Sequence, residues 1–372
     1  MNPSSRLSRS LATLAAATVV AAGAAGTASA STAPAAHPAT QGAQFGNAFS
    51  RSPFSTASVT PGTASGTLAV DWSAPHLRGG VAVFAGTSSS TQTHFLGFGP
   101  SSGSLTVTAA HGDWIRLVPS SGDPLVLSVR DLGLASDPNL RDAGGYRTAD
   151  GQWVRMGVVY RSQALSLSSA DLAVVDTLGI TNDYDLRTTA EIAQSPDVVP
   201  AGAAYTNLNV LADLSITPTL TSSASAAQYM QEMEQDFVTD ATARAGFGQL
   251  LTGIADSKGA VVYHCTAGKD RTGWASAVLL TLLGVPEQTV TQDYLLSNTY
   301  YFDSPAVQAM LKAIPAAEAA VYAPMLEVQA SYLQAGFAQV KASYGSMYEY
   351  AVKGLGVSPQ TIAKLRAKLL VG

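Results

Sequence analysis

The fold is decided by one stretch of the sequence, Val261-Val262-Tyr263-His264-Cys265-Thr266-Ala267-Gly268-Lys269-Asp270-Arg271-Thr272-Gly273. The apolar run over residues 260–263 predicts a buried strand. The segment from Arg271 to Leu283 has the composition of a helix, and Gly284 and Pro286 follow as its stop signals. A strand that passes through a short loop directly into a helix is the unit from which α/β folds are built.

The loop between this strand and this helix is suited to hold an anion. Its small residues let successive backbone N–H groups turn toward one point, and the helix start adds unpaired N–H groups and the positive end of its dipole. The loop is not a nucleotide-binding P-loop, because Asp270 stands where that motif has Ser or Thr. We therefore expect a phosphate to be held by Thr266, Ala267, Gly268, Lys269, Asp270 and Arg271.

Cys265 and Arg271 stand at the two ends of this loop. The N–H groups and the positive neighbours would stabilise Cys265 as a thiolate, which is a strong nucleophile. The planar guanidinium of Arg271 can hold two phosphate oxygens and stabilise the charge of the transition state. The predicted chemistry is displacement at phosphorus, which gives a phosphocysteine that water then hydrolyses. The alternative is a core thiol at a strand end.

Two further residues of the stretch are expected to support this chemistry. Thr272 would donate a hydroxyl hydrogen bond to the departing thiolate of Cys265. His264 is expected to fix the backbone of the loop rather than to act as a base. The combination of these residues, and no single member, points to the site.

The rest of residues 131–372 alternates between the strand and helix patterns. Residues 158–160 and 180–186 read as strands, residues 224–251 read as one long helix, and the chain through Leu370 is mostly helical. The predicted fold class is α/β, with a central, mainly parallel sheet flanked by helices.

A different pattern precedes this part, over residues 61–130. Short β-prone runs are separated by clusters of Gly, Ser and Pro, which predicts a small all-β sandwich-like domain of fibronectin or immunoglobulin type. The runs are Gly66–Trp72, Val81–Ala85, Thr93–Phe98, Leu105–Ala109, Trp114–Val118 and Leu125–Val129. We expect this domain to be a spacer, with contact to the cell wall or a host surface as the alternative.

The N-terminal residues 1–30 read as a signal peptide. Arg6 and Arg9 precede a short apolar run, and Ala28-Ser29-Ala30 forms an A-x-A cleavage site. No later stretch is long and apolar enough to span a bilayer, so the mature chain is expected to be secreted and extracellular without an integral membrane segment. Residues 31–60 are rich in Ala, Ser, Thr and Pro and are expected to form a flexible linker.

Charge and residue counts exclude several classes of function. Loss of residues 1–30, with Arg6 and Arg9 and no acid, changes the formal net charge from −5 to −7. An acidic chain has no basic field for nucleic acid. The single cysteine, Cys265, excludes an intramolecular disulfide. The His, Asp and Glu residues do not cluster at metal-ligand spacing, so neither a metal nor another cofactor is expected.

Residues 264–273 resemble the active-site signature of the protein tyrosine phosphatase superfamily, His-Cys-x-x-Gly-x-x-Arg-Thr-Gly, in the form found in a bacterial secreted tyrosine/serine phosphatase subgroup. The resemblance covers roughly residues 135–370 and omits the β-rich part. Further segments resemble the subgroup in the same order: Asn139-Leu140-Arg141-Asp142-Ala143-Gly144-Gly145-Tyr146-Arg147, Tyr160-Arg161-Ser162, Asp185-Leu186-Arg187 with Glu191, and Asp293-Tyr294-Leu295-Leu296-Ser297-Asn298.

The resemblance implies a phosphocysteine mechanism but leaves the proton donor open. The sequence contains no Trp-Pro-Asp, and Ser195-Pro196-Asp197 reads as a loop turn. In the resembled subgroup the acid of the loop, here Asp270, is the better candidate for protonating the leaving oxygen. Asp185 is the second candidate, because it falls at the end of a strand where α/β sites gather, and a supporting role for it is equally compatible.

These observations predict a metal-independent phosphatase acting on a phosphorylated protein or lipid. Phosphotyrosine is the first expected substrate, with phosphoserine or phosphothreonine as further substrates. Arg141, Arg147 and Arg161 are candidates for binding a second phosphate or a substrate carboxylate. Two alternatives stay open: a phosphoinositide or inositol phosphate phosphatase, and an inactive phosphate-binding or wall-adhesive protein.

Overall fold

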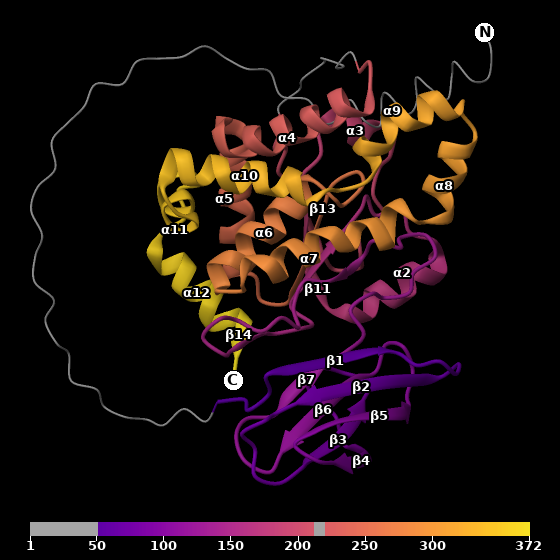
Figure 1. Cartoon of the computed structure of the whole chain (residues 1–372), viewed down its shortest axis with the longest axis vertical. Coiled ribbons are helices and arrows are strands. Elements are labelled where there is room, and N and C mark those ends of the chain that lie inside the picture. Colours follow the sequence, from indigo (N-terminus) through magenta and orange to yellow (C-terminus); the bar gives the residue numbers. More distant parts are fainter. Residues whose placement is uncertain (1–50, 212–219) are drawn as a thin grey trace, which may run out of the picture.

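The computed structural model describes residues 51–211 and 220–372 (Figure 1). The predicted signal peptide and the linker through residue 50 lie outside the described residues. The described chain forms an α/β part and, next to it, a β-rich part made by residues 56–127. In these described segments, no helix combines the length and apolar character that a membrane crossing requires.

The β-rich part consists of two antiparallel sheets, of order β1-β2-β5 and β4-β3-β6-β7. Its strands are β1 (Thr56–Pro61), β2 (Thr67–Ser73), β3 (Val81–Gly86), β4 (His94–Gly99), β5 (Ser102–Thr108), β6 (Trp114–Pro119) and β7 (Leu125–Leu127). All six predicted β runs coincide with strands β2–β7. The linker prediction for residues 31–60 is wrong from Thr56 onward, because Thr56–Pro61 pairs along its whole length with β2. The likeness to fibronectin or immunoglobulin domains stays a prediction.

The core of the β-rich part continues into the α/β part. Alternating strand residues such as Val81 and Val83 are buried between the sheets. The same cluster of buried side chains contains Trp153 and Met156, and Val371 packs against it. These three residues belong to the α/β part of the chain, so the two parts share apolar surface.

The α/β part is built on one five-stranded sheet, of order β12-β11-β13-β10-β8. Its strands are β8 (Arg141–Asp142), β10 (Val159–Ser162), β11 (Ile180–Asp185), β12 (Ala204–Asn207) and β13 (Ala260–His264). Neighbouring strands are parallel except for β8, which pairs antiparallel to β10. The prediction of a mainly parallel sheet is confirmed. A small antiparallel pair joins β9 (Trp153–Val154) to β14 (Leu370–Val371).

Helices cover this sheet on both faces (Figure 1). They are α2 (Ser169–Val175), α3 (Thr189–Gln194), α4 (Ser223–Thr239), α5 (Ala241–Asp256), α6 (Arg271–Leu283), α7 (Glu287–Ser297), α8 (Pro305–Lys312), α9 (Ala316–Leu326), α10 (Ala330–Tyr344), α11 (Met347–Glu349) and α12 (Pro359–Leu369). Short 3₁₀ and π segments follow α2, α7 and α11, at Asp176–Leu178, Asn298–Phe302 and Tyr350–Gly354.

The helix expected over residues 224–251 is two helices. Asp240 separates α4 from α5, with the extended backbone of a residue outside a helix. Its side chain accepts a hydrogen bond from the backbone N–H of Ala243 at 2.9 Å and so caps α5. An aspartate that caps a helix looks, in the sequence, like an exposed polar residue within a helix. The helical periodicity therefore does not reveal that one helix ends and another begins at Asp240.

The central helix α6 is held in the middle of the core. Trp274 is fully buried, and its ring packs against Phe337 of α10 and Tyr350. Gly336 lets α10 approach this ring, since a Cβ atom there would lie 2.5 Å from Trp274 Cζ3. This packing, with β13 on the other side, fixes the direction in which the N-terminus of α6 points.

Candidate active site

The predicted strand, loop and helix are present, and they place Cys265 at the carboxyl edge of the sheet. β13 ends at His264, and α6 begins at Arg271. β13 lies between its parallel neighbours β10 and β11, so the loop emerges where open α/β sheets bind ligands. Cys265 is only 2% exposed.

The carbonyl groups of the loop are held by partners from outside it. The Thr266 carbonyl accepts the backbone N–H of Ala164 at 3.2 Å. The Ala267 carbonyl accepts the side-chain amide of Asn139 at 2.8 Å. The Gly268 carbonyl accepts Nη2 of Arg161 at 3.0 Å. Three consecutive carbonyls are thereby fixed, each by a partner that lies more than a hundred residues away along the chain.

This anchoring orients the N–H groups of the loop. The N–H and C=O groups of a trans peptide point in opposite directions, so carbonyls tied to the surrounding chain turn the N–H groups the other way. Within the described chain, no acceptor is recorded for the backbone N–H groups of residues 266–270. Together with the N-terminus of α6, these unpaired donors form a site for an anion.

Gly268 is required by the close approach of the loop to β10. Its φ of +68° lies in the left-handed region. A Cβ atom would lie 2.5 Å from the Ser162 carbonyl oxygen and 2.6 Å from the Gln163 backbone nitrogen. Any other residue would push the loop away from the strand that anchors it.

Arg271 is set in place by Glu191 of α3. Its Nη1 and Nη2 atoms donate to the two carboxylate oxygens of Glu191 at 2.8 and 2.7 Å, and the Thr266 hydroxyl also donates to this carboxylate. Burial would raise the pKa of Glu191, but the charge of Arg271 and these hydrogen bonds lower it to about 2. Burial alone would lower the pKa of Arg271, yet Glu191 and Cys265 raise it.

This pairing leaves part of the Arg271 guanidinium available. Nε–H is buried and has no hydrogen-bond partner in the described structure. A guanidinium carries five N–H donors, and the two that face Glu191 leave others for phosphate oxygens. From the sequence, Glu191 was expected only as part of a segment that resembles the phosphatase subgroup, without a role of its own. The available signal was its capping box with Thr188, which places it on the first turn of α3.

Lys269 and Asp270 pair with each other. Lys269 Nζ donates to Asp270 Oδ1 at 2.9 Å, and both side chains are buried. The phosphate-binding role of Lys269 stays a prediction. The buried carboxyl of Glu234 in α4 lies in the same region, where burial first and the charge of Asp270 second raise its pKa well above the usual range.

Asp185 takes part in a buried network behind the loop. Its carboxylate pairs with Arg187 at 2.8 Å and accepts the Tyr205 hydroxyl at 2.9 Å. Burial would raise the pKa of Asp185, but Arg187 and His264 lower it to about 2. An acid that is ionised and fully engaged is a poor proton donor, so these contacts favour the supporting role over the catalytic one.

His264 is the positive centre of this network. Its ring nitrogens lie 3.2 Å from Asp183, 3.8 Å from Asp185 and 3.6 Å from Asp197. Burial would lower the pKa of His264, but the three carboxylates together raise it to about 9. Its backbone carbonyl accepts the N–H of Leu186 at 2.9 Å, which ties the end of β13 to the end of β11. The geometry fits the loop-supporting role expected for this residue.

Asp197 was interpreted as part of a turn, and it has a second role. Its carboxylate pairs with Arg187 and accepts the backbone N–H of Leu165 at 3.0 Å. Asp185, Asp197 and His264 also bring three possible metal ligands within 4.8 Å of one another. Arg187 already supplies a positive charge to both carboxylates, so this cluster is an ion-pair network.

The arginines proposed for a second phosphate are used elsewhere. Arg161 pairs with Asp293 at 2.7 Å, and Arg141 contacts Asn139 and Asp293. Both arginines are completely buried. Arg147 donates to the backbone carbonyl of Phe54, just before β1, at 3.0 Å. The substrate-binding prediction for Arg141 and Arg161 is therefore wrong: their charge neutralises Asp293 and supports the loop.

Thr272 and Tyr301 border the loop. The Thr272 hydroxyl is buried and has no hydrogen-bond partner in the described residues, which leaves it available to Cys265 as expected. The pKa of Tyr301 is raised by burial first and then by the charges of Asp270 and Cys265. Its ring belongs to an apolar cluster with residues of α8 and α9, against which Ala267 packs, so these two helices cover the loop.

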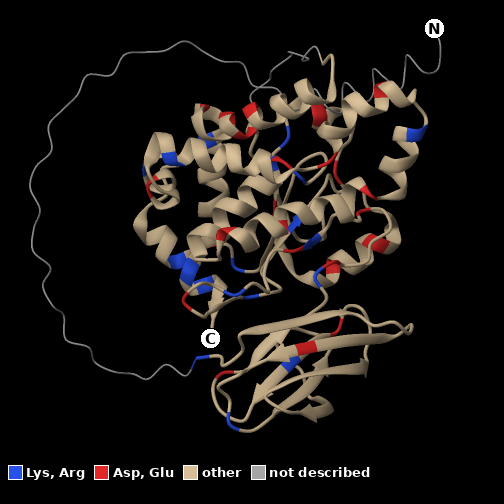
Figure 2. Cartoon of the chain, viewed as in Figure 1, with Lys and Arg blue, Asp and Glu red and all other residues tan. Residues whose placement is uncertain are grey.

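Figure 2 shows basic and acidic segments side by side in the interior of the α/β part.

An anion-binding loop that starts from a buried cysteine and ends on a fixed arginine fits the active site of a phosphatase. The chain belongs to the tyrosine phosphatase family, whose model matches residues 132–371, and it is a phosphoric monoester hydrolase. The matched range leaves out the β-rich part.

Three relatives agree with this assignment. A Cupriavidus necator protein assigned to the tyrosine-protein phosphatases is 36% identical over 256 residues, 65% of this chain and 89% of the relative. The triple specificity protein phosphatase PtpB of Mycobacterium tuberculosis is 30% identical, over 66% of this chain and all of the relative. A tyrosine-protein phosphatase of Nostoc commune is 30% identical, over 55% of this chain and 70% of the relative.

The buried network predicts a pH-dependent cost for removing His264. The pKa of His264 is raised from 6.5 to about 9, so its contribution to stability is complete below pH 6.5 and is lost as the pH rises through 9. His264→Gln leaves buried carboxylates without this partner and should lower the free energy of unfolding by about 3–5 kcal/mol at pH 6. Denaturant unfolding of both proteins from pH 6 to 10 measures the difference, which should shrink toward pH 10.

His94→Gln is the matched control, because His94 is exposed on β4. This substitution should change the free energy of unfolding by less than about 0.5 kcal/mol. A difference between wild type and His264→Gln that stays constant over this pH range would contradict the charged state of His264.

Proposed function

We propose that this tyrosine phosphatase is secreted and acts through a phosphocysteine formed on Cys265. The observation that carries the mechanism is the loop of residues 266–270, whose carbonyls are tied outward and whose N–H groups are unpaired around Cys265. Such donors bind the phosphoryl oxygens beside Cys265.

In the first step the Cys265 thiolate attacks the phosphorus atom of a phosphomonoester. A sulfur–phosphorus bond forms, the bond from phosphorus to the leaving oxygen breaks, and that oxygen takes a proton. In the second step water attacks the phosphocysteine, which releases inorganic phosphate and restores the thiolate. The hydroxyl of Thr272, which has no partner in the described structure, supplies a hydrogen bond to the sulfur as it departs.

Arg271 binds the phosphoryl oxygens in both steps. Glu191 holds two of its five N–H donors, so the plane of the guanidinium is set before substrate arrives. A donor group that is already oriented loses little conformational entropy when the transition state forms. In that state the negative charge is spread over the equatorial phosphoryl oxygens. Glu191 is a positioning residue in this scheme, because it acts through Arg271.

Asp270 is the proposed donor of the proton to the leaving oxygen. It belongs to the loop itself, between Lys269 and Arg271, whereas Asp185 is ionised and engaged by Arg187 and Tyr205. Its carboxylate is buried and accepts a hydrogen bond from Lys269 at 2.9 Å. Asp270 is therefore favoured over Asp185 by its position.

Phosphotyrosine in proteins is the proposed first substrate, and phosphoserine or phosphothreonine the further ones. The relative from Mycobacterium tuberculosis is named for triple specificity, which supports a wider range. Arg141 and Arg161, two of the three arginines expected to bind a second phosphate, are completely buried and engaged by other residues. The phosphoinositide alternative is weaker for this reason.

The first test is hydrolysis of para-nitrophenyl phosphate by residues 31–372 in the presence of EDTA and a thiol reductant. Wild type should turn over, and Cys265→Ser should lose all measurable activity while its thermal unfolding stays unchanged, because Ser is a far weaker nucleophile. A folded, reduced wild type without turnover would favour the phosphate-binding or adhesive alternative, and activity in the variant would refute the phosphocysteine. Phosphotyrosine peptide, phosphoserine peptide and inositol phosphates as substrates then rank specificity.

The proton-donor role of Asp270 predicts a dependence on the leaving group. Asp270→Asn should lower kcat by roughly 10²–10⁴-fold for a phosphoserine peptide, whose alkoxide needs a proton, and far less for para-nitrophenyl phosphate. Asp303→Asn, an exposed acid near the same region, is the control. An equal loss for both substrates would assign Asp270 to organising the loop instead.

Secretion is tested by the N-terminus of the protein recovered from the medium of an expressing bacterial culture. Cleavage after Ala30 should give a mature chain that begins at Ser31. Substituting Ala28→Lys should block processing, since the site needs small residues. Uncleaved wild-type chain retained in the cells would overturn the proposal.

A further inference from the structure

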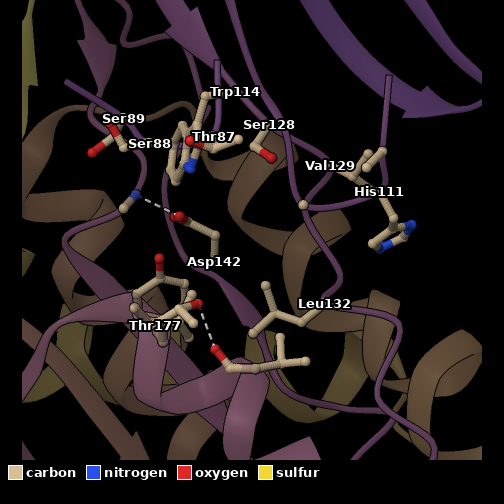
Figure 3. A pocket seen from close by; sticks show the side chains of 16 residues that line it. Thr87, Ser88, Ser89, His111, Trp114, Ser128, Val129, Leu132, Asp142 and Thr177 are labelled. Carbon is tan, nitrogen blue, oxygen red and sulfur yellow. Dashed lines mark hydrogen bonds between the residues drawn. The ribbon is translucent and has the colours of Figure 1, made fainter. Parts of the chain in front are cut away.

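A second cavity lies between the β-rich part and the α/β part, on residues that the phosphatase site does not use. Its volume is 510 Å³, within the range of about 300–1,000 Å³ that small-molecule sites have. One wall comes from turns of the β sheets, with Trp114 and Ser128, and the opposite wall comes from Val174 and Thr177 at the end of α2. Figure 3 shows Trp114, Asp142, Thr177 and Leu132 around the same hollow.

Tyr160 is a polar residue of the cavity wall. The residue lines it and is only 2% exposed. Its ring is held in the core of β10, and its hydroxyl has no hydrogen-bond partner among the described residues. The hydroxyl is not among the buried atoms that lack a partner, so it is open to the cavity and can pair with a molecule bound there.

Asp142 supplies a buried acceptor on the same surface. Its two carboxylate oxygens accept the backbone N–H groups of Gly144 at 2.7 Å and Gly157 at 2.5 Å. Each oxygen can accept at least one further hydrogen bond. Burial raises the pKa of Asp142 to about 6, although the N–H groups of Gly157 and Gly144 and the charge of Arg130 act to lower it.

Trp114 forms a rigid apolar wall. A Cβ atom at Gly157 would lie 2.8 Å from Trp114 Cη2, so the indole ring rests directly on the backbone of that glycine. Leu132 and Val129 add apolar surface beside it. A flat aromatic wall facing acceptors and hydroxyls suits a ring that has apolar C–H faces and hydroxyls at its edge.

The charges on the lining disfavour an anionic ligand. None of the described lining residues is Lys or Arg, so an anion finds no cation there. His111 at the rim is paired with Asp131, whose Oδ1 lies 3.3 Å from His111 Nε2. The remaining polar side chains are hydroxyls, including those of Thr87, Ser88 and Ser128.

We propose that this cavity binds a neutral, hydroxyl-rich ring compound, a mono- or disaccharide, between Trp114, Asp142 and Tyr160. The sugar ring would stack on Trp114, its hydroxyls would donate to Asp142, and the Tyr160 hydroxyl would pair with a sugar oxygen. Because the walls come from both parts of the chain, bound sugar stabilises their contact. The proposal is independent of catalysis at Cys265.

The test is titration of the full chain with glucose, galactose, N-acetylglucosamine and their disaccharides, followed by tryptophan fluorescence and by thermal unfolding. We expect saturable binding of at least one sugar with a rise in unfolding temperature. Tyr160→Phe keeps the ring and should weaken binding by about tenfold, which is the effect of one lost hydrogen bond. Tyr348→Phe, at a tyrosine that is 47% exposed on α11, should bind as wild type does.

Trp114→Leu provides a second variant in case Tyr160→Phe does not fold, and it should abolish stacking. Binding of disaccharides but not of monosaccharides would identify the terminus of a glycan rather than a free sugar as the ligand. Absence of binding for every sugar overturns the proposal, as does binding that both variants leave unchanged. A response to choline or inorganic phosphate alone would also overturn it. Tyr160→Phe should still hydrolyse para-nitrophenyl phosphate, so a failure of sugar binding can be distinguished from a failure of the phosphatase function.

Discussion

The outward anchoring of three consecutive carbonyls, those of Thr266, Ala267 and Gly268, is the constraint on which the rest of the site depends. Without partners on the outside, these peptides would be free to rotate and pair their N–H groups within the loop. The partners come from β10, from the segment that follows it, and from the segment before β8. The sheet must therefore assemble before the loop can hold an anion. A local motif thus acquires its function only from long-range contacts.

Buried charge is the second theme of the α/β part. Only 13% of residues are charged, yet many of these lie inside, in three groups of paired opposite charges around Asp293, Glu191 and His264. Taking such groups out of water costs free energy, which their mutual attraction offsets only when the geometry is good. These buried ion pairs fix the orientation of their side chains. Arg161 holds a loop carbonyl, and Arg271 faces the site. Charge in this chain is used for local positioning rather than for a long-range field.

The sequence was sufficient to predict what depends on neighbours along the chain. The strand, loop and helix around Cys265, the mainly parallel sheet and the strands β2–β7 were all readable from periodicity and small residues. The pairing of Glu191 with Arg271 was not, because it joins residues eighty positions apart. The burial of Arg141 and the second role of Asp197 were hidden for the same reason. At Asp240 and at Thr56–Pro61, a local composition typical of helix or linker was overridden by capping and by strand pairing.

Glu191 stabilises both the start of α3 and the position of Arg271, which links these sites in evolution. Its carboxylate caps the first turn of α3 through Thr188 and also orients Arg271. A change in the first turn of α3 would therefore also change the orientation of Arg271. Selection that acts on turnover reaches Thr188 through this link, although Thr188 belongs to neither the loop nor α6. Among descendants of a common ancestor, positions 188, 191 and 271 would then change together or not at all.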